Sequence, residues 1–252
     1  MIKSLIKKML SKIGFYHKNQ IYKEFLFRKP DYLDFLFGLV LSEISKKKKI
    51  KIIQVGAMDG VKRDPINEII TNEALREKIL LLAIEPQEKE FVKLKKNYKN
   101  FNNVECSNCL IGNGDYMDFY LYKDNFRKGN KDDNNSGNSS VLKSHLEKYI
   151  KEQGFEDVDN YIRSVRLKSH KLEDVIKNHQ NFDDADMLFI DAEGFDDQVI
   201  YNSSIDKFNF NIIGYEFKGL NESKLKDLHN YLAKRNYKIF RWKKSDELAI
   251  KI

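Results

Sequence analysis

The sequence has few of the residues that mark extracellular or membrane-spanning proteins. It contains 2 cysteines and 3 prolines in 252 residues, and its longest apolar run, residues 32–41, is interrupted by Asp34 and Gly38. A membrane-spanning helix needs about 18 consecutive apolar residues, so none is predicted. Lysines recur through the first apolar stretch, unlike in a signal peptide. We therefore expect a cytoplasmic protein in a reducing compartment, without a disulfide framework.

Positive charge is concentrated at one end of the chain. Residues 1–50 contain 12 Lys and Arg against 4 Asp and Glu, a net charge of +8, whereas residues 51–252 contain 33 against 34, a net charge of −1. Enzymes that act on nucleic acids usually spread cationic side chains around a phosphate-binding groove. The nearly neutral main body therefore argues against a nucleic-acid partner.

The N-terminal segment, residues 1–49, is predicted to be a basic helical extension. Over residues 1–15, apolar residues share one helical face and lysines lie on or beside the opposite face. Such a helix docks on its own domain, on a second copy of the chain, or peripherally on an anionic surface such as the inner membrane. A second helix is expected over residues 31–45, apolar on most sides and therefore buried.

From residue 50 onward, short apolar runs alternate with helical stretches. This alternation predicts a single domain over residues 50–252, with a mostly parallel sheet covered by helices on both faces. Ligands of such sheets bind beyond the carboxyl ends of the strands. The expected strands are residues 51–55, 79–84, 104–110, 187–190, 212–217 and 237–242, and the expected helices are residues 65–78, 87–99, 172–179, 195–201 and 222–235.

A glycine turn and a later acidic residue predict a site for an adenosine-containing ligand. Gly56 and Gly60 follow the first strand and allow a tight turn with close approach of a ligand. Glu85 and Pro86 end the second strand, where a carboxylate can accept hydrogen bonds from both ribose hydroxyls. Asp59, in the turn itself, repels a pyrophosphate and suits the ammonium group of a methionine-like moiety. These charges favour S-adenosylmethionine over NAD.

Five stretches of the chain share their order and spacing with one enzyme family. They are residues 54–60 followed by Asp64-Pro65-Ile66; Glu85-Pro86 with Phe91, Leu94 and Asn97-Tyr98; Ser139-Ser140 leading to His145; residues 191–196; and Gly214-Tyr215-Glu216. On these stretches the chain, from about residue 50 to its C-terminus, resembles the FkbM family of S-adenosylmethionine-dependent methyltransferases. The first motif of that family often begins with Asp, where this chain has Gln54, whose amide can still bond the cofactor but adds no charge.

The resemblance implies a fold and an activity. The implied fold is the class I, Rossmann-like methyltransferase fold with a mostly parallel seven-stranded sheet. The implied activity is methylation of a hydroxyl of a sugar or natural product, and many bacterial members act in capsular or lipopolysaccharide biosynthesis.

Carboxylates follow the strand expected over residues 187–190. Strand alternation aims Asp191 and Glu193 to the same side of the sheet edge, next to the expected methyl donor. One of them can take the proton from a sugar hydroxyl. Alternatively, with Glu216 of the adjoining strand, they hold Mg²⁺ or Mn²⁺, which lowers the pKa of the hydroxyl. His145, on a predicted helix beside a polar loop, is a further candidate base.

Other segments complete the predicted site. Asn108 and Cys109 follow the third strand, where residues commonly line an adenine pocket. The polar loop over residues 123–140 is a binding lid or a disordered insertion. The aromatic residues Tyr116, Phe119, Tyr120 and Tyr122, with the cations Lys123, Arg127 and Lys128, form either an acceptor pocket or a strand with its aromatic side chains packed inward.

These features lead to one function and two alternatives. The leading hypothesis is an S-adenosylmethionine-dependent O-methyltransferase for an activated sugar (a nucleotide-linked sugar or heptose) or a glycan in bacterial surface-polysaccharide biosynthesis. One alternative is methylation of RNA or protein on the same fold. The other is a cofactor-binding scaffold held at the membrane by the N-terminal helix, because a fold does not fix a function.

Overall fold

The computed structural model of the protein describes residues 32–62, 64–123, 126, 139–208 and 210–252. They fall into two compact units: residues up to 50 with residues 65–80, and residues 51–64 with residues 81–252. The predicted N-terminal helix and its membrane contact over residues 1–15 lie outside the described residues. Among the described helices, none has the length and apolar character that crossing a bilayer requires.

The described residues of the first unit are mainly helical. In their longest helix Leu36, Val40 and Ile44, each four residues apart, are buried, while Phe35 is 44% exposed. The helix predicted over residues 31–45 is therefore present, and from Leu33 to Ile44 every side chain except that of Phe35 is buried or partly buried. The elements are α3 (Tyr32–Lys46), α4 (Pro65–Ile70) and the 3-10 turn η1 (Arg76–Lys78).

The helix predicted over residues 65–78 is shorter in the structure. Helix α4 has 6 residues and ends at Ile70. Just beyond it, the Asn72 side chain accepts a hydrogen bond from the Ala74 N–H at 3.1 Å. Such local side-chain bonds compete with continuation of a helix, so the chain turns here and resumes only as η1.

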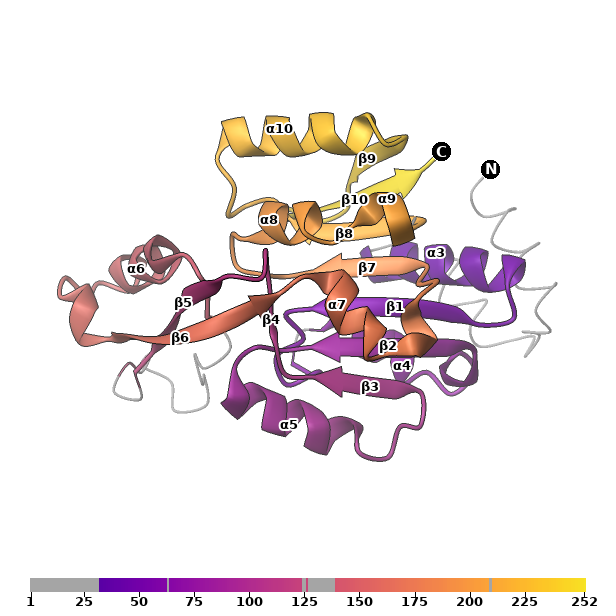
Figure 1. Cartoon of the computed structure of the whole chain (residues 1–252), viewed down its shortest axis with the longest axis horizontal. Helices are drawn as coiled ribbons and strands as arrows, with labels where there is room; N and C mark the ends of the chain where they lie inside the picture. Colours follow the sequence, from indigo (N-terminus) through magenta and orange to yellow (C-terminus); the bar gives the residue numbers. More distant parts are fainter. Residues whose placement is uncertain (1–31, 63, 124–125, 127–138, 209) are drawn as a thin grey trace, which may run out of the picture. The chain divides into compact units, whose positions relative to one another are not determined.

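The second unit is built on a seven-stranded sheet of order β3-β2-β1-β7-β8-β10-β9 (Figure 1). The strand β10 pairs antiparallel with both of its neighbours, β8 and β9, whereas the pairs β2–β3, β1–β7 and β7–β8 are parallel. The seven-stranded, mostly parallel sheet is confirmed. Its strands are β1 (Ile50–Val55), β2 (Ile79–Ile84), β3 (Val104–Ser107), β7 (Met187–Ile190), β8 (Ile212–Glu216), β9 (Tyr237–Arg241) and β10 (Asp246–Lys251).

The central strand β7 is buried along its whole length, as strands of parallel sheets usually are. Its four side chains are at most 6% exposed. Gly214 of β8 lies opposite Phe189 in the ladder, and a Cβ added there would lie 2.6 Å from the Phe189 ring. The helices of this unit outside the small sheet are α5 (Glu88–Tyr98), α7 (Leu172–Lys177), η4 (Gln180–Phe182), α8 (Asp196–Tyr201), α9 (Ile205–Phe208) and α10 (Glu222–Ala233).

A second, three-stranded sheet of order β4-β6-β5 belongs to the same unit. In Figure 1 the arrowheads of β1, β2 and β3 point toward β4, and helix α6 lies with β5 and β6. Phe126, Leu146, Ile150 and Ile162 form a separate hydrophobic cluster here. The elements are β4 (Leu110–Ile111), β5 (Tyr116–Tyr122), α6 (Lys143–Glu152), η3 (Val158–Asn160) and β6 (Ile162–His170).

One predicted strand is divided between the two sheets. The apolar run over residues 104–110 predicts a single strand, but β3 ends at Ser107. The Asn108 side chain donates hydrogen bonds to the carbonyl oxygens of Glu85 and Pro86, at 2.8 and 3.3 Å. These bonds turn the chain away from the large sheet, and Leu110 then pairs with β6.

Candidate active site

A cavity lies where the carboxyl ends of β1, β2 and β7 face the small sheet, the edge at which parallel sheets bind ligands. The space between its lining atoms is about 560 Å³, a volume that includes open solvent. Its lining comes from both sheets. The lining residues are Val55, Gly56, Met58, Glu85 and Pro86; Leu110, Ile111, Phe119, Ser139, Ser140 and Val141; and Asp191, Ala192, Glu193, Phe195 and Val199.

Gly56 brings the first turn against the loop that follows β7. Its φ is +83°, in the left-handed region, and an added Cβ would lie 1.9 Å from the carbonyl oxygen of Asp191. The N–H groups of Gly56 and Ala57 both donate to the carbonyl of Ile84, at 2.9 and 3.0 Å. Only a residue without a side chain fits this position, and it joins the ends of β1, β2 and β7.

Asp59 and Gly60 shape the same turn without joining the described lining of the cavity. Asp59 accepts hydrogen bonds from the N–H groups of Val61 and Lys62 through one carboxylate oxygen, at 3.0 and 2.9 Å. Gly60 has a φ of +72°, and an added Cβ would lie 2.5 Å from the ring of Tyr98. Only one of its two carboxylate oxygens takes part in these bonds, so the predicted contact of Asp59 with the cofactor ammonium stays a prediction.

Gln54 has one side-chain acceptor atom that no described residue bonds. Its side-chain nitrogen donates to Asp64 at 3.1 Å. Its Oε1 atom is buried and has no hydrogen-bond partner in the described part of the chain. Buried polar atoms are normally paired, so this oxygen can accept a bond from a bound group. Gln54 stands directly before Val55, which lines the cavity.

Glu85 places a buried carboxylate in the cavity wall. It is 3% exposed, and its two oxygens accept from the N–H groups of Met58 and Gln87, at 2.9 and 2.7 Å. Burial raises the pKa of Glu85 to about 7, against the opposing effect of these two hydrogen bonds. Each oxygen keeps a further lone pair, so the carboxylate can still accept from ligand hydroxyls.

Asn108 and Cys109 stand behind this wall rather than in its described lining. Asn108 bonds the backbone after β2, as above, and the Cys109 sulfur lies 3.6 Å from the Ser107 hydroxyl. The next two residues, Leu110 and Ile111, reach the cavity instead. The apolar run after Cys109 is the sequence signal that could have identified them.

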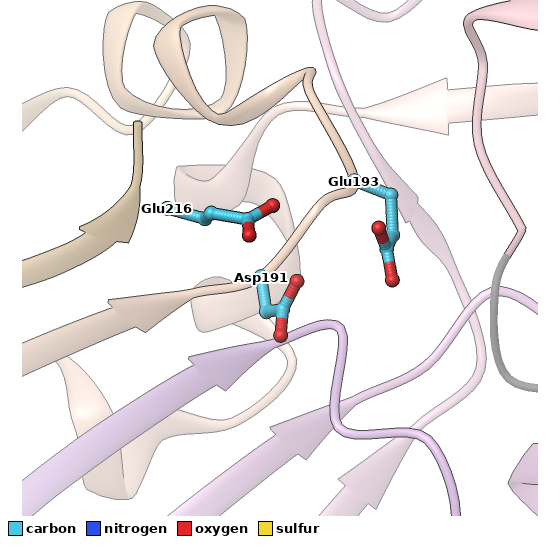
Figure 2. Close-up of side chains that lie close together, drawn as sticks. All are labelled: Asp191, Glu193 and Glu216. Atoms are coloured by element: carbon cyan, nitrogen blue, oxygen red, sulfur yellow. The ribbon is translucent and has the colours of Figure 1, made fainter. Parts of the chain in front are cut away.

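Three carboxylates converge at the ends of β7 and β8. Figure 2 shows Asp191 at the end of β7, Glu193 on the following loop and Glu216 at the end of β8. One oxygen of each lies within 4.8 Å of the others. Asp191 is accessible from the cavity, although protein atoms surround its carboxyl group. The pKa of Asp191 is raised well above its ordinary value, mainly because the carboxyl group is desolvated and secondly because Glu193 is negatively charged. The same two causes raise the pKa of Glu216.

His145 on α6 joins this group through Glu193. Its Nε2 atom lies 2.8 Å from a carboxylate oxygen of Glu193. The hydrogen bond with Glu193 raises the pKa of His145, against the opposing effect of burial. The sequence presents these residues as separate candidate bases, whereas the structure brings them together as a pair. Glu193 is the member of the pair that lines the cavity.

A match to a known protein family identifies the kind of enzyme that carries this site. The chain matches the model of the methyltransferase FkbM domain over residues 54–239 of its 252 residues. The protein belongs to the FkbM methyltransferase family. It is an S-adenosylmethionine-dependent methyltransferase with the class I, Rossmann-like fold, and the predicted family is confirmed.

Solved structures similar to this FkbM methyltransferase share little sequence with it. Precorrin-6y C5,15-methyltransferase from Geobacter metallireducens is 11% identical, with a TM-score of 0.41, covering 85% of this chain and 86% of that chain. Fibrillarin from Aeropyrum pernix, solved with natively bound S-adenosyl-L-methionine, is 9% identical, with a TM-score of 0.41 over 81% and 67% of the two chains. The human methyltransferase 10 domain containing protein is 12% identical, with a TM-score of 0.41 over 89% and 83%. No curated protein matches the chain.

Two residues that sequence reasoning does not select as site residues bond the backbone that carries the carboxylates of this FkbM methyltransferase. Asp196, 0% exposed, accepts from the N–H groups of Glu216 and Gly194, at 3.1 and 3.3 Å. Ser140, 1% exposed, donates its hydroxyl to the carbonyl oxygen of Glu193 at 2.9 Å. Both residues stand in stretches that carry the family resemblance, which is the signal that could have found them.

The aromatic segment contributes less to the cavity than an acceptor pocket requires. Phe119 lines it and is buried, whereas Tyr116 is 62% exposed. Tyr122 stacks on Phe126, with ring centroids 4.8 Å apart. The structure thus shows a strand whose aromatic side chains largely pack on the small sheet. Lys123 bonds the Asp159 carbonyl at 3.1 Å, and Arg127 and Lys128 lie outside the described residues.

Proposed function

We propose that this FkbM methyltransferase methylates a hydroxyl of an activated sugar, such as a nucleotide-linked sugar or heptose, or of a glycan, in the biosynthesis of bacterial capsular or surface polysaccharide. The observation that supports this most directly is the hydrogen-bonded pair of His145 and Glu193 beside Asp191. A hydroxyl must lose its proton as it attacks a methyl group, and a positioned carboxylate or imidazole can accept that proton.

The cavity has the features that S-adenosylmethionine needs. Gly56 allows close approach of the main chain, and Glu85 offers a carboxylate for ribose hydroxyls. Next to the lining residue Val55, the Oε1 atom of Gln54 is a buried acceptor without a partner among the described residues. No Lys or Arg stands in the lining that the structure describes, which suits a ligand without pyrophosphate. When bound, the cofactor supplies an electrophilic methyl group. The residues that would hold it are Gly56, Met58, Glu85, Pro86, Leu110 and Ile111.

The acidic residues then divide the work of proton removal in this proposal. Glu193 reaches the cavity, so its carboxylate takes the proton of the acceptor hydroxyl. His145 lies 2.8 Å from that carboxylate and fixes it. Asp191 orients the hydroxyl from the end of β7. Alignment and proton removal are the main tasks of such a site.

A divalent cation is the second part of this proposal. Asp191 and Glu216, with Glu193, offer the oxygen ligands that Mg²⁺ or Mn²⁺ prefer. A cation held there would lower the pKa of the acceptor hydroxyl. Loss of activity in EDTA, restored by Mg²⁺ or Mn²⁺, is the expected result if the cation takes part. Full activity in EDTA would assign proton removal to Glu193 and His145 alone.

The deciding experiment is a transfer assay. Purified protein and methyl-labelled S-adenosylmethionine are incubated with a panel of nucleotide sugars, with bulk RNA and with protein. We expect label in at least one sugar, and a fall in kcat of roughly 10²-fold or more in Glu193→Gln. Glu105→Gln, which changes a surface carboxylate on β3, is the matched control. Label in RNA or protein, and in no sugar, would refute the proposal.

A further inference from the structure

The peptide bond between Glu193 and Gly194 is held at both of its polar atoms. Its carbonyl oxygen accepts a hydrogen bond from the Ser140 hydroxyl at 2.9 Å, and its N–H donates to Asp196 at 3.3 Å. Ser140 and Asp196 are 1% and 0% exposed, so the side chains that make both bonds are buried. Together they fix the plane of this one peptide group.

The backbone conformation beside this peptide group is unfavourable and needs support from neighbouring residues. Glu193 has a φ of +50°, in the left-handed region that residues with a side chain rarely adopt. Such a conformation persists where the surrounding structure imposes it, commonly at functional sites. Gly194, with a φ of +91°, packs closely on Gly219, where an added Cβ would lie 2.6 Å from the Gly194 Cα. Contacts with Ser140, Asp196 and Gly219 therefore fix the position of this loop.

Ser140 also reaches the helix that carries His145. Its hydroxyl oxygen accepts from the Leu142 N–H at 3.0 Å, one residue before α6 begins. Its own N–H and carbonyl pair with Tyr120 of β5, at 3.1 and 2.8 Å. One side chain thus joins the backbone of Glu193 to the start of the His145 helix.

From this arrangement we infer that Ser140, together with Asp196, is a positioning residue that sets the pose of the Glu193–His145 pair for proton removal. The inference rests on the proposed function, because it assigns these residues to the same reaction. Ser140 lines the cavity as well, so the test must separate positioning from contact with the acceptor.

Ser140→Ala removes the hydroxyl, and Ser169→Ala is its matched control. Ser169 is 0% exposed, and its hydroxyl likewise donates to a carbonyl, that of Asp115 at 2.8 Å, and accepts from an N–H, that of Gly114 at 3.1 Å. Both variants lose the same two kinds of bond from the same unit. Only Ser140→Ala frees the Glu193–Gly194 peptide.

Two measurements follow. In Ser140→Ala we expect hydrogen exchange at the Gly194 amide to become about tenfold faster, and kcat to fall about tenfold with KM for both substrates within about twofold. Ser169→Ala should change neither, and Ser140→Thr, which keeps the hydroxyl, should restore both. A raised KM for the acceptor at unchanged kcat would show contact rather than positioning and overturn the inference.

The exchange measurement needs no substrate, so it separates this inference from the proposed function. Even if no sugar is methylated, faster exchange in Ser140→Ala but not in Ser169→Ala supports the conclusion that Ser140 holds the Glu193–Gly194 peptide. Equal exchange rates in Ser140→Ala and Ser169→Ala refute it, whatever the acceptor is. Should Ser140→Ala fail to fold, Ser140→Cys, with its weakly donating thiol, carries the same comparison.

Discussion

Glu85 shows how a single buried carboxyl group ties stability to pH. Burial raises its pKa from 4.5 to about 7, so between these values the folded state binds a proton that the unfolded state has lost. The contribution of this group to stability therefore falls as pH rises from 4.5 to 7, and the cost is complete above pH 7. A ligand whose hydroxyls bond the ionised form would offset that cost.

The variant Glu85→Gln removes this titration. From pH 5 to pH 8, its free energy of unfolding should rise by about 1–3 kcal/mol relative to that of the wild type. Urea unfolding at the two pH values measures this difference, with the exposed Glu88→Gln as control. Calorimetry should show weaker S-adenosylmethionine binding by the same variant. A difference that does not change with pH would contradict the burial argument.

Asp191 is expected to matter for turnover more than for cofactor affinity. An amide cannot hold a cation as a carboxylate does, and it has one acceptor oxygen instead of two for orienting the hydroxyl, so Asp191→Asn should lower kcat by roughly 10²-fold or more. Its shape is kept, so the affinity for S-adenosylmethionine, measured by calorimetry, should change less than about threefold. Near-normal turnover would remove Asp191 from the mechanism.

Asp59 shows that charge alone does not give the direction of a side chain. Its place in the glycine turn suggests an ammonium partner, yet its carboxylate bonds Val61 and Lys62 in the turn itself. Short polar side chains readily form such local bonds, and their direction depends on backbone angles that residue types do not show. The convergence of Asp191, Glu193 and Glu216 is easier to predict, because neighbouring parallel strands end at one edge.

Strands in which apolar and polar residues alternate only weakly are not predicted from the sequence. In β6 only Ile162 and Ser169 of nine residues are buried, so the alternation that signals a strand is weak. In β10, the charge of Glu247 predicts a surface position, but this side chain is buried. Its carboxylate accepts from Tyr215 and pairs with His229 and Arg241, partners that only the folded chain brings together.

The turn after β1 can be tested by adding one methyl group. In Gly56→Ala the new Cβ meets the Asp191 carbonyl, whereas Gly154→Ala, at a similar φ of +86°, meets nothing within 4 Å. The control thus carries the cost of the backbone angle alone, about 1–2 kcal/mol. We expect Gly56→Ala to lose about 2–4 kcal/mol in chemical unfolding and to abolish cofactor binding. Equal losses would show that the close approach is unimportant.

For the molecule as a whole, cofactor binding should appear as thermal stabilisation. A ligand of the folded state at 100 times its Kd stabilises by about 2.7 kcal/mol, which for a chain of this size raises Tm by about 5–10 °C. Scanning calorimetry with S-adenosylmethionine should show this shift, and NAD at the same concentration should not. A shift with NAD alone would contradict the assignment of the cavity.

The separation of the two sheets has a consequence for how this enzyme can change. In the described residues, β4, β5 and β6 pair only with one another, yet they supply one wall of the cavity. A substitution of Phe119 on β5, which is not among the residues proposed to hold the cofactor, can alter which molecule fits without disturbing the register that holds Gly56 against Asp191. The preference for an acceptor can therefore change, by selection or by engineering, while the residues that hold the methyl donor stay the same.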